Sequence, residues 1–141
     1  MAALIEDYAL LGNCKTAALV ARDGSLDWLC FPRFDSPACF AALLGDSDNG
    51  RWKIAPTRQA LNVERRYRDG TLILETLFET ETGRAMLIDF MPVDRGSHVV
   101  RIVQGLEGYV FFDLDLAIRF DYGSSVPWVE NKGGHLLTAV A

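Results

Sequence analysis

The clearest hydrophobic pattern in the chain is a strict alternation over residues 110–121. One set of alternate positions is apolar and consists of Val110, Phe112, Leu114, Leu116, Ile118 and Phe120. The intervening set is mostly polar and consists of Phe111, Asp113, Asp115, Ala117, Arg119 and Asp121. A period of two residues over this length predicts a β-strand with one buried face and one face largely in water.

Similar apolar and aromatic runs recur along the chain, separated by turn signals at intervals of about ten residues. Asp23-Gly24 is a strong hairpin signal between the runs at 16–21 and 25–31, because such turns need positive φ. Further strands are predicted over residues 51–55, 61–68, 71–80, 84–91, 98–106, 126–130 and 135–141. This pattern predicts an all-β fold, an antiparallel β-sandwich forming a single domain over residues 1–141.

Two stretches depart from the strand pattern. Residues 38–44, ACFAALL, are short, rich in Ala and Leu, and followed by Gly45, so one short helix is expected there. The chain ends within residues 136–141, LLTAVA, with no turn or cap after them. We therefore expect a truncated sandwich whose unpaired apolar edge seeks a partner, which favours a homodimer through exposed strand edges.

The composition predicts a folded protein that binds neither nucleic acid nor membranes. Hydrophobic residues make up 50% and charged residues 23%, and the net charge is −5 at pH 7. An acidic chain lacks the basic stripe that holds a nucleic-acid backbone, and no run of about 18 apolar residues predicts a membrane span. Glu6 and Asp7 stand where a secretion signal needs a basic flank. Because the three cysteines lack close-pair spacing, we expect a cytoplasmic protein with reduced thiols.

Aromatic and charged residues concentrate between residues 27 and 40, in the sequence DWLCFPRFDSPACF. Pro32 removes a backbone donor and is expected to end the strand before it. Pro37 disfavours helix in the residues before it, so residues 33–37 are predicted to form a loop between two buried segments. Loops of this kind, positioned by a rigid scaffold, frequently bind something.

Two interpretations of this loop remain open. In the first, its side chains pack internally and Arg33 pairs with Asp35 or Asp27; the aromatic residues that would fill the core are Trp28, Phe31, Phe34 and Phe40. In the second, the loop contacts another domain near a sugar site. Arginine and aspartate form bidentate hydrogen bonds, and aromatic faces can stack on pyranose rings.

The same region carries a resemblance to a known family. The residues concerned are EDYALLGNCKTAALV at 6–20, RDGSLDW at 22–28, PRFDSPACFAALLG at 32–45, GRW at 50–52, IDFMP at 88–92, RFDYG at 119–123 and VPW at 126–128. In their order and spacing they resemble the N-terminal domain of bacterial and archaeal glucoamylase- and trehalase-like enzymes of glycoside hydrolase family fifteen.

The resemblance implies a supersandwich-like β-sandwich that precedes a separate (α/α)6 barrel. In that family the barrel carries the two catalytic carboxylates and hydrolyses α-glucosidic bonds with inversion, in an α-glucan, maltose or trehalose. No catalytic residue is therefore assigned in this chain, whose implied role is to support the missing barrel. The candidate domain-interface or sugar-proximal residues are Asp27, Trp28, Arg33, Phe34 and Asp35.

Two acidic residues stand out because apolar residues flank them, Asp27 in DWLCF and Asp89 in IDFMP. Desolvation there would raise a carboxyl pKa, as an acid catalyst needs; the alternative for each is a strand-end aspartate bonded to backbone or arginine. No metal ion or cofactor is expected, since His98 and His135 are far apart and lack cysteines at zinc spacing.

The tryptophans support a rival interpretation, a stand-alone carbohydrate-binding module. A sugar-stacking face could be built from Trp28, Trp52 and Trp128 with Tyr67, Tyr109 and Tyr122, and Trp52 and Trp128 are its first candidates. Such modules are also β-sandwiches, so the fold alone does not discriminate. A module needs two or three coplanar exposed aromatic rings, whereas a support domain buries them.

Overall fold

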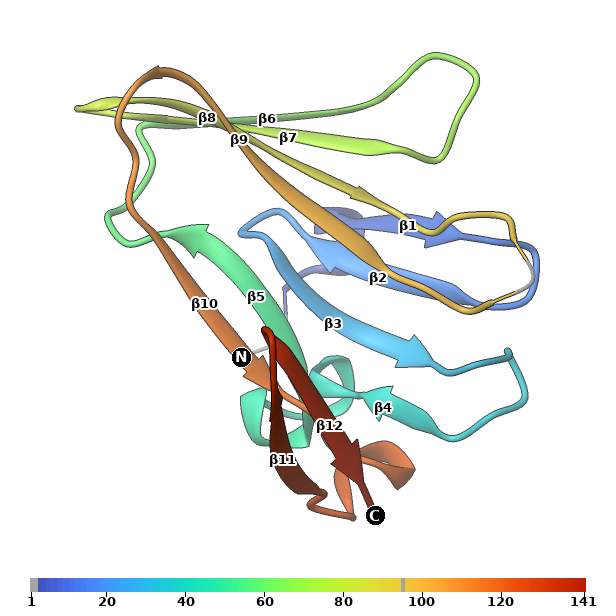
Figure 1. Cartoon of the computed structure of the whole chain (residues 1–141). Coiled ribbons are helices and arrows are strands. Elements are labelled where there is room, and N and C mark those ends of the chain that lie inside the picture. The colour runs from blue at the N-terminus through green and yellow to red at the C-terminus, as the bar shows by residue number, and fades with distance from the viewer. Residues whose placement is uncertain (1–2, 95) are drawn as a thin grey trace.

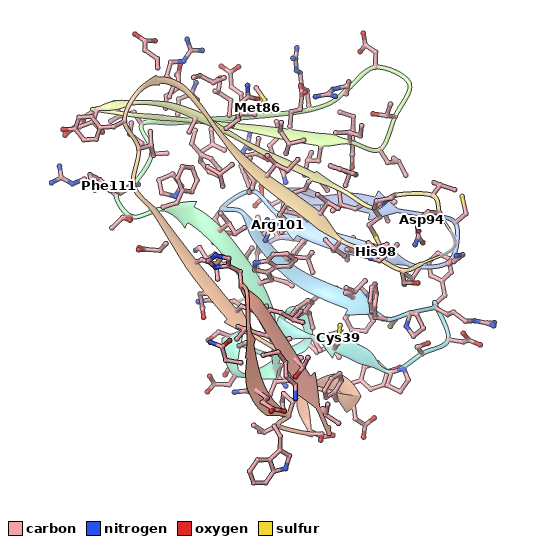
Figure 2. All side chains as sticks on the ribbon, viewed as in Figure 1. Cys39, Met86, Asp94, His98, Arg101 and Phe111 are labelled. Carbon is pink, nitrogen blue, oxygen red and sulfur yellow. The ribbon has the colours of Figure 1, made fainter. Side chains whose placement is uncertain are left out.

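Two antiparallel β-sheets form the layers of the structure, a computed structural model that describes residues 3–94 and 96–141 (Figure 1). Their facing sides supply one core cluster that includes Leu11, Val20 and Leu74, and another that includes Ile54 and Phe78. Figure 2 shows the side chains that fill the space between the layers. The predicted all-β antiparallel sandwich is therefore confirmed.

The larger sheet has six strands in the order β1-β2-β3-β5-β10, with β4 also paired to β3. Its strands are β1 (Tyr8–Gly12), β2 (Ala17–Ala21), β3 (Ser25–Cys30), β4 (Ala38–Phe40), β5 (Arg51–Pro56) and β10 (Phe112–Ala117). Two strands share the second edge of β3. Ser25 and Leu26 pair with β5, and Leu29 and Cys30 pair with β4.

The smaller sheet has four strands in sequence order. They are β6 (Asn62–Tyr67), β7 (Leu74–Thr80), β8 (Gly83–Phe90) and β9 (Val100–Gly108). A separate hairpin follows, formed by β11 (Trp128–Gly133) and β12 (Leu136–Val140), which pair only with each other in the described chain. The short 3₁₀ turns are η1 (Ile5–Asp7), η2 (Ala42–Leu44), η3 (Ser47–Asn49) and η4 (Asp121–Gly123).

The prediction of a short helix over residues 38–44 is wrong for its first half. Ala38–Phe40 forms strand β4, and only Ala42–Leu44 makes a 3₁₀ turn, whose cap is Gly45. Ala38 and Phe40 are both buried, and Phe40 lies opposite Leu29 of β3. Pairing with the free half of the β3 edge satisfies the backbone and buries these side chains, and this tertiary contact overrides the local helix preference.

The prediction that one face of residues 110–121 is buried is also only partly correct. Strand β10 covers Phe112–Ala117, and Phe112 packs edge-on against Phe78 of the opposite sheet, with ring centroids 6.0 Å apart. Leu114 and Leu116, on the same side by alternation, are exposed, Leu114 to 66%. Strand β10 is the last strand of the larger sheet, and the described residues leave this part of it uncovered.

A buried ion pair of the smaller sheet lies between the facing sides of the two sheets. Arg101 of β9 and Asp89 of β8 are direct cross-strand partners, and both side chains are fully buried. Arg101 donates from Nε to Asp89 Oδ1 at 2.8 Å and from Nη2 to Asp89 Oδ2 at 3.1 Å. Burial raises the pKa of the Asp89 carboxyl above its ordinary value, and the hydrogen bonds and charge of Arg101 offset part of that rise.

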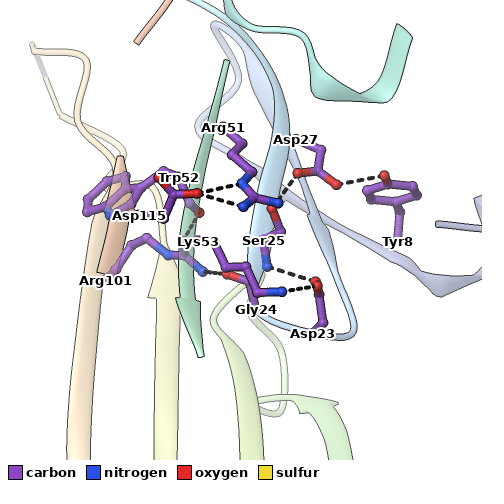
Figure 3. A network of polar contacts seen from close by, with 10 residues as sticks. All are labelled: Tyr8, Asp23, Gly24, Ser25, Asp27, Arg51, Trp52, Lys53, Arg101 and Asp115. Carbon is purple, nitrogen blue, oxygen red and sulfur yellow. Dashed lines mark hydrogen bonds and ion pairs between the residues drawn. The ribbon is translucent and has the colours of Figure 1, made fainter. Parts of the chain in front are cut away.

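The same guanidinium group also binds the larger sheet. Arg101 donates from Nη2 to the carbonyl of Gly24 at 2.8 Å and from Nη1 to the carbonyl of Trp52 on β5 (Figure 3). It lies 5.3 Å from the centre of the Trp52 ring, within cation–π range. We call the unit of Arg101, Asp89, Trp52 and Gly24 the inter-sheet clamp.

The β2–β3 turn reaches this clamp because Gly24 has no side chain. Its φ is 83°, and a Cβ there would lie 2.1 Å from the carbonyl oxygen of Ile54. That close approach lets the Gly24 carbonyl accept both from Arg101 and, at 3.1 Å, from the backbone amide of Ile54. The glycine in the predicted Asp23-Gly24 hairpin signal therefore also serves a long-range contact.

On the outer face of the smaller sheet, Glu75 of β7 is a buried carboxylate. Arg66 donates to it from Nε at 2.9 Å, and Arg68 donates from Nε and Nη2 at 3.1 and 2.7 Å. Both arginines are largely exposed, whereas the Glu75 side chain is buried. The hydrogen bond from Arg68, with that from Arg66, lowers the pKa of Glu75 below its ordinary value against the opposing effect of burial.

We predict that Arg101→Met lowers the free energy of unfolding by about 3–5 kcal/mol, because it leaves the Asp89 carboxylate buried without its partner. Urea unfolding followed by tryptophan fluorescence measures this. Arg33→Met, which removes an ion pair with both partners exposed, is the matched control and is expected to cost less than about 1 kcal/mol. Equal effects of the two substitutions would contradict a central role for the clamp.

Because its folded pKa is lowered, Glu75 stabilises the fold above its unfolded pKa of about 4.3. We expect Glu75→Gln to lower the free energy of unfolding by about 1 kcal/mol at neutral pH, a value reduced for the exposure of both arginines. The deficit is expected to shrink as the pH falls through the folded pKa of Glu75. Urea titrations at a series of pH values measure this loss of unfolding free energy, with the exposed Glu107→Gln as control. A loss that does not change with pH would refute the lowered pKa of Glu75.

Candidate functional site

Three loops meet at one end of the sandwich, the right-hand end in Figure 1. They are the β1–β2 loop, the β3–β4 loop and the β8–β9 loop. The backbone amide of Phe34 donates to the carbonyl of Lys15 at 2.9 Å, and Lys15 Nζ donates to the carbonyl of Asp94 at 2.8 Å. Ser97 Oγ donates to the carbonyl of Pro32 at 3.3 Å. These contacts join three segments that are far apart in sequence.

The β1–β2 loop is rigid because a buried amide organises it. Asn13 is almost fully buried, and its Oδ1 accepts from the backbone amides of Lys15 and Thr16, both at 3.0 Å. Thr16 Oγ1 donates to the carbonyl of Cys30 at 2.5 Å, which attaches the loop to the end of β3. The loop thus has a fixed geometry beside the residues that follow β3.

A recess of about 530 Å³ opens between the first two loops, lined by Cys14, Lys15, Arg33, Phe34 and Asp35. Arg33 donates from Nε to Asp35 Oδ1 at 3.0 Å and from Nη2 to Asp35 Oδ2 at 3.3 Å. Both of these charged side chains are exposed, and Phe34 is exposed to 64%. The site therefore presents a cation, an anion and an aromatic ring to solvent on one ordered surface.

The structure agrees with part of the first interpretation of this loop and leaves the second, contact with another domain, as a prediction. Arg33 pairs with Asp35, as internal packing predicted, and Phe40 lies in the core with Phe31 packed against it. Trp28 is half-buried, but Phe34 points away from the core, so the prediction that it fills the interior is wrong. The two flanks of the loop pack against the core, whereas residues 33–35 are exposed and can contact another molecule.

Asp27 and Trp28 lie on β3 rather than in this recess. Asp27 is buried, and accepts from Tyr8 Oη at 2.8 Å and from Ser25 Oγ at 2.5 Å (Figure 3). Burial and the neighbouring Asp27 together raise the pKa of the Tyr8 hydroxyl. Trp28 packs beside Tyr122, with ring centroids 6.1 Å apart. Geometrically, Asp27 is placed to hold β1 and β3 together.

The three tryptophans lie in three different places. Trp52 lies between the sheets under the Arg101 guanidinium, and its ring packs against both core clusters. Trp128, on the β11–β12 hairpin, is exposed to 86%. The described ring pairs are tilted or edge-on, with interplanar angles of 38° for Trp28–Tyr122 and 68° for Tyr109–Phe111. Within the described residues, the tryptophans do not form the coplanar exposed face that a sugar-stacking module of this design requires.

Within residues 3–94 and 96–141, no group of three or more His, Cys, Asp or Glu side chains comes together in a way that would hold a metal ion. In the same described residues, no helical segment is long and apolar enough to cross a membrane. Asp89, which the flanking residues made a candidate acid, has Arg101 as its partner, as the strand-end alternative predicted.

Sequence reasoning missed the contribution of Asn13, Cys14 and Lys15 to this end of the sandwich. The only signal was their position inside the block at residues 6–20 that carries the family resemblance. Lys15 reaches Asp94 across 79 positions in the sequence, and local patterns contain no information about a contact of that range.

The fold and the loops define a class, an all-β sandwich domain with an exposed charged loop at one end. Residues 1–139 match the family described as trehalase-like, N-terminal, and the chain belongs to this family. The trehalase-like part of the predicted resemblance is thereby confirmed.

Individual relatives agree with this assignment. The chain is 42% identical over 85 residues to a trehalase of Mycolicibacterium smegmatis, which covers 60% of this chain and 13% of that protein. It is 37% identical over 97 residues to a trehalase of Mycobacterium tuberculosis, and the match covers 69% of this chain and 14% of that protein. It is 33% identical over 128 residues to trehalase 1 of Sulfolobus acidocaldarius, and that match covers 91% of this chain and 22% of that protein. The chain thus spans less than a quarter of the length of these relatives. No solved structure matches it significantly.

We predict that Cys14 is alkylated much faster than Cys30 and Cys39. Cys14 is exposed, whereas burial raises the pKa of Cys39 to about 11 and also raises that of Cys30. Iodoacetamide labelling followed by mass spectrometry measures the three rates, and in denaturant all three thiols are expected to react alike. Fast labelling of Cys39 in the native chain would mean that the β3–β4 region opens readily.

Proposed function

We propose that this chain is a non-catalytic N-terminal domain that supports trehalose hydrolysis by a separate catalytic domain. The observation that carries the proposal is the family match over residues 1–139, together with relatives named as trehalases that are more than four times as long as the matched part. The catalytic partner proposed here is an (α/α)6 barrel of glycoside hydrolase family fifteen. There, a general acid and a general base would act with inversion across a water molecule. The cytoplasm is the proposed location.

An uncovered apolar surface on the C-terminal third supports a partner domain. Six exposed apolar residues lie on strand β10 or on the β11–β12 hairpin: Leu114, Leu116, Trp128, Val129, Leu136 and Leu137. Large exposed apolar side chains that gather on neighbouring elements mark interaction sites in soluble proteins. Because successive strand residues point to opposite faces, Trp128 and Val129, like Leu136 and Leu137, lie on the two faces of the hairpin. We propose that the catalytic domain packs around β10 and the hairpin and covers these side chains.

In this proposal the Arg33–Asp35 loop reaches toward the sugar site of the catalytic domain. The guanidinium and the carboxylate offer charge-assisted hydrogen bonds to hydroxyl groups, and the exposed Phe34 ring offers an apolar face. Trehalose is the proposed substrate because the matched relatives are named trehalases; maltose and longer α-glucans are the alternatives.

A second role, homodimerisation through strand edges, also has structural support. Strands β9 and β10 each pair along only one edge within the described residues. An open edge is a template for pairing with another chain. Sedimentation of the chain over a range of concentrations tests this role, and a monomer throughout that range would exclude it.

The support role is tested with a chimera. Trehalase 1 of Sulfolobus acidocaldarius is prepared with its matching N-terminal segment either deleted or replaced by this chain, and glucose release from trehalose is measured. We expect the deletion to be inactive, the chimera to be active, and this chain alone to be inactive. Turnover by this chain alone would refute the non-catalytic role. A folded chimera as inactive as the deletion would refute the support role.

The same chimera tests the loop. Arg33→Ala is expected to lower kcat/KM for trehalose by about tenfold, the effect of losing one charge-assisted hydrogen bond. Arg84→Ala is the matched control, because Arg84 also forms an exposed ion pair, with Glu79, on the smaller sheet. Equal kcat/KM values for the two variants would place the loop away from the sugar.

A further inference from the structure

A second recess lies at the other end of the sandwich, where the β9–β10 connection carries Phe111 (Figure 2). Its volume is about 310 Å³, at the lower end of the range for small-molecule sites. Three segments line it: residues 56–59 and 61 at the end of β5 and just after it, residues 80–82 at the β7–β8 turn, and residues 109–111. It shares no lining residue with the recess beside Arg33.

Backbone contacts hold these three segments in a fixed arrangement. The amide of Thr57 donates to the carbonyl of Phe111 at 2.9 Å, and the amide of Tyr109 donates to the carbonyl of Thr82 at 3.1 Å. Thr82 Oγ1 returns a hydrogen bond to the carbonyl of Tyr109 at 2.8 Å. Gly108 permits this approach, because its φ is 60° and a Cβ there would lie 2.2 Å from the carbonyl oxygen of Thr82. The recess is therefore preorganised.

The walls are aromatic and largely exposed. Tyr109 and Phe111 pack edge to face with centroids 5.7 Å apart, and Phe111 is exposed to 72%. Leu61, also exposed, lines the recess with them. Exposed aromatic rings held by a rigid backbone cost little conformational entropy when a ligand packs on them.

Three polar side chains that line the recess have unused hydrogen-bond donors and acceptors. Within residues 3–94 and 96–141, the side chains of Arg58, Gln59 and Glu81 form no hydrogen bond or ion pair. They provide guanidinium donors, an amide that both donates and accepts, and a carboxylate acceptor. One positive and one negative charge cancel, so the recess favours a neutral ligand with both donor and acceptor groups.

We propose that this recess binds a neutral hexopyranose unit. Such a sugar has an apolar C–H face, which can pack on the exposed ring of Phe111 alone, without the coplanar pair of rings that a stacking module needs. It also has hydroxyl groups around its rim that both donate and accept hydrogen bonds. A purely apolar side chain of a peptide would leave Arg58, Gln59 and Glu81 unpaired and partly desolvated, which costs free energy. The site is independent of the proposed support role and lies at the opposite end of the sandwich from the Arg33 loop.

The test is a nuclear magnetic resonance titration of the ¹⁵N-labelled 141-residue chain with methyl α-D-glucopyranoside, followed by trehalose. We expect saturable shifts confined to the amides of Thr82, Gly83 and Tyr109 and their neighbours. Phe111→Ala is expected to weaken binding at least about fivefold, the effect of losing one aromatic contact. Leu44→Ala removes an exposed apolar side chain outside the recess and is expected to leave the dissociation constant unchanged.

Two comparison ligands make the result decisive. Mannitol offers hydroxyl groups without a pyranose face and is expected to bind at least about fivefold more weakly than the glucoside. N-acetyl-phenylalaninamide stands for a peptide anchor; saturation of the same amides by it, but not by the sugars, would overturn the proposal in favour of a peptide site. Sugar shifts that centre on Arg33 or Trp128, that never saturate, or that survive Phe111→Ala would also overturn it.

Discussion

The buried guanidinium of Arg101 constrains more of this fold than any other single group. A charge between two sheets is tolerated only when it is paired and its donors are used. Arg101 meets that condition with Asp89 in its own sheet and with the carbonyls of Trp52 and Gly24 in the other. A shift of β8 or β9 by one residue would turn Asp89 or Arg101 to the outside and leave the other unpaired. The clamp therefore fixes strand register and sheet spacing together, which hydrophobic contacts alone specify less strictly.

With the interior fixed, the two ends of the sandwich become rigid platforms for loops. At one end, buried Asn13 and the tethered Lys15 support the exposed Arg33–Asp35 pair. At the other, Gly108 lets the β9–β10 connection lie against the β7–β8 turn and form a preorganised recess. Both loop sets are held by backbone hydrogen bonds and by bonds between the backbone and the side chains of Asn13, Lys15 and Thr82. The outward side chains of residues 33–35 and of Phe111 do not contribute to the core. These side chains are therefore available for binding without loss of stability.

The sequence predicted most of the strands, the main hairpin and a loop at residues 33–37, because alternation and turn residues act locally. It did not predict strand β1, and it left open whether the loop packs internally or is exposed. It could not establish which face is buried. In residues 84–91, Met86, Ile88 and Phe90 share a side, yet Leu87 and Asp89 on the opposite side are the fully buried ones. That choice depends on Arg101, twelve positions beyond Asp89. Likewise, Ala38–Phe40 became a strand because β3 had a free edge, and Lys15 became part of the site through a contact with the distant β8–β9 loop.

The C-terminal hairpin is the element that the rest of the described chain supports least. Strands β11 and β12 pair only with each other among the described residues, and every residue of β11 is exposed, Trp128 to 86%. An isolated two-stranded hairpin is marginally stable at best in water. A defined position for it requires apolar burial that the rest of the described chain does not provide. A partner surface over β10 and this hairpin would supply that burial, so the same contact that orders the hairpin would also attach the sandwich to its neighbour.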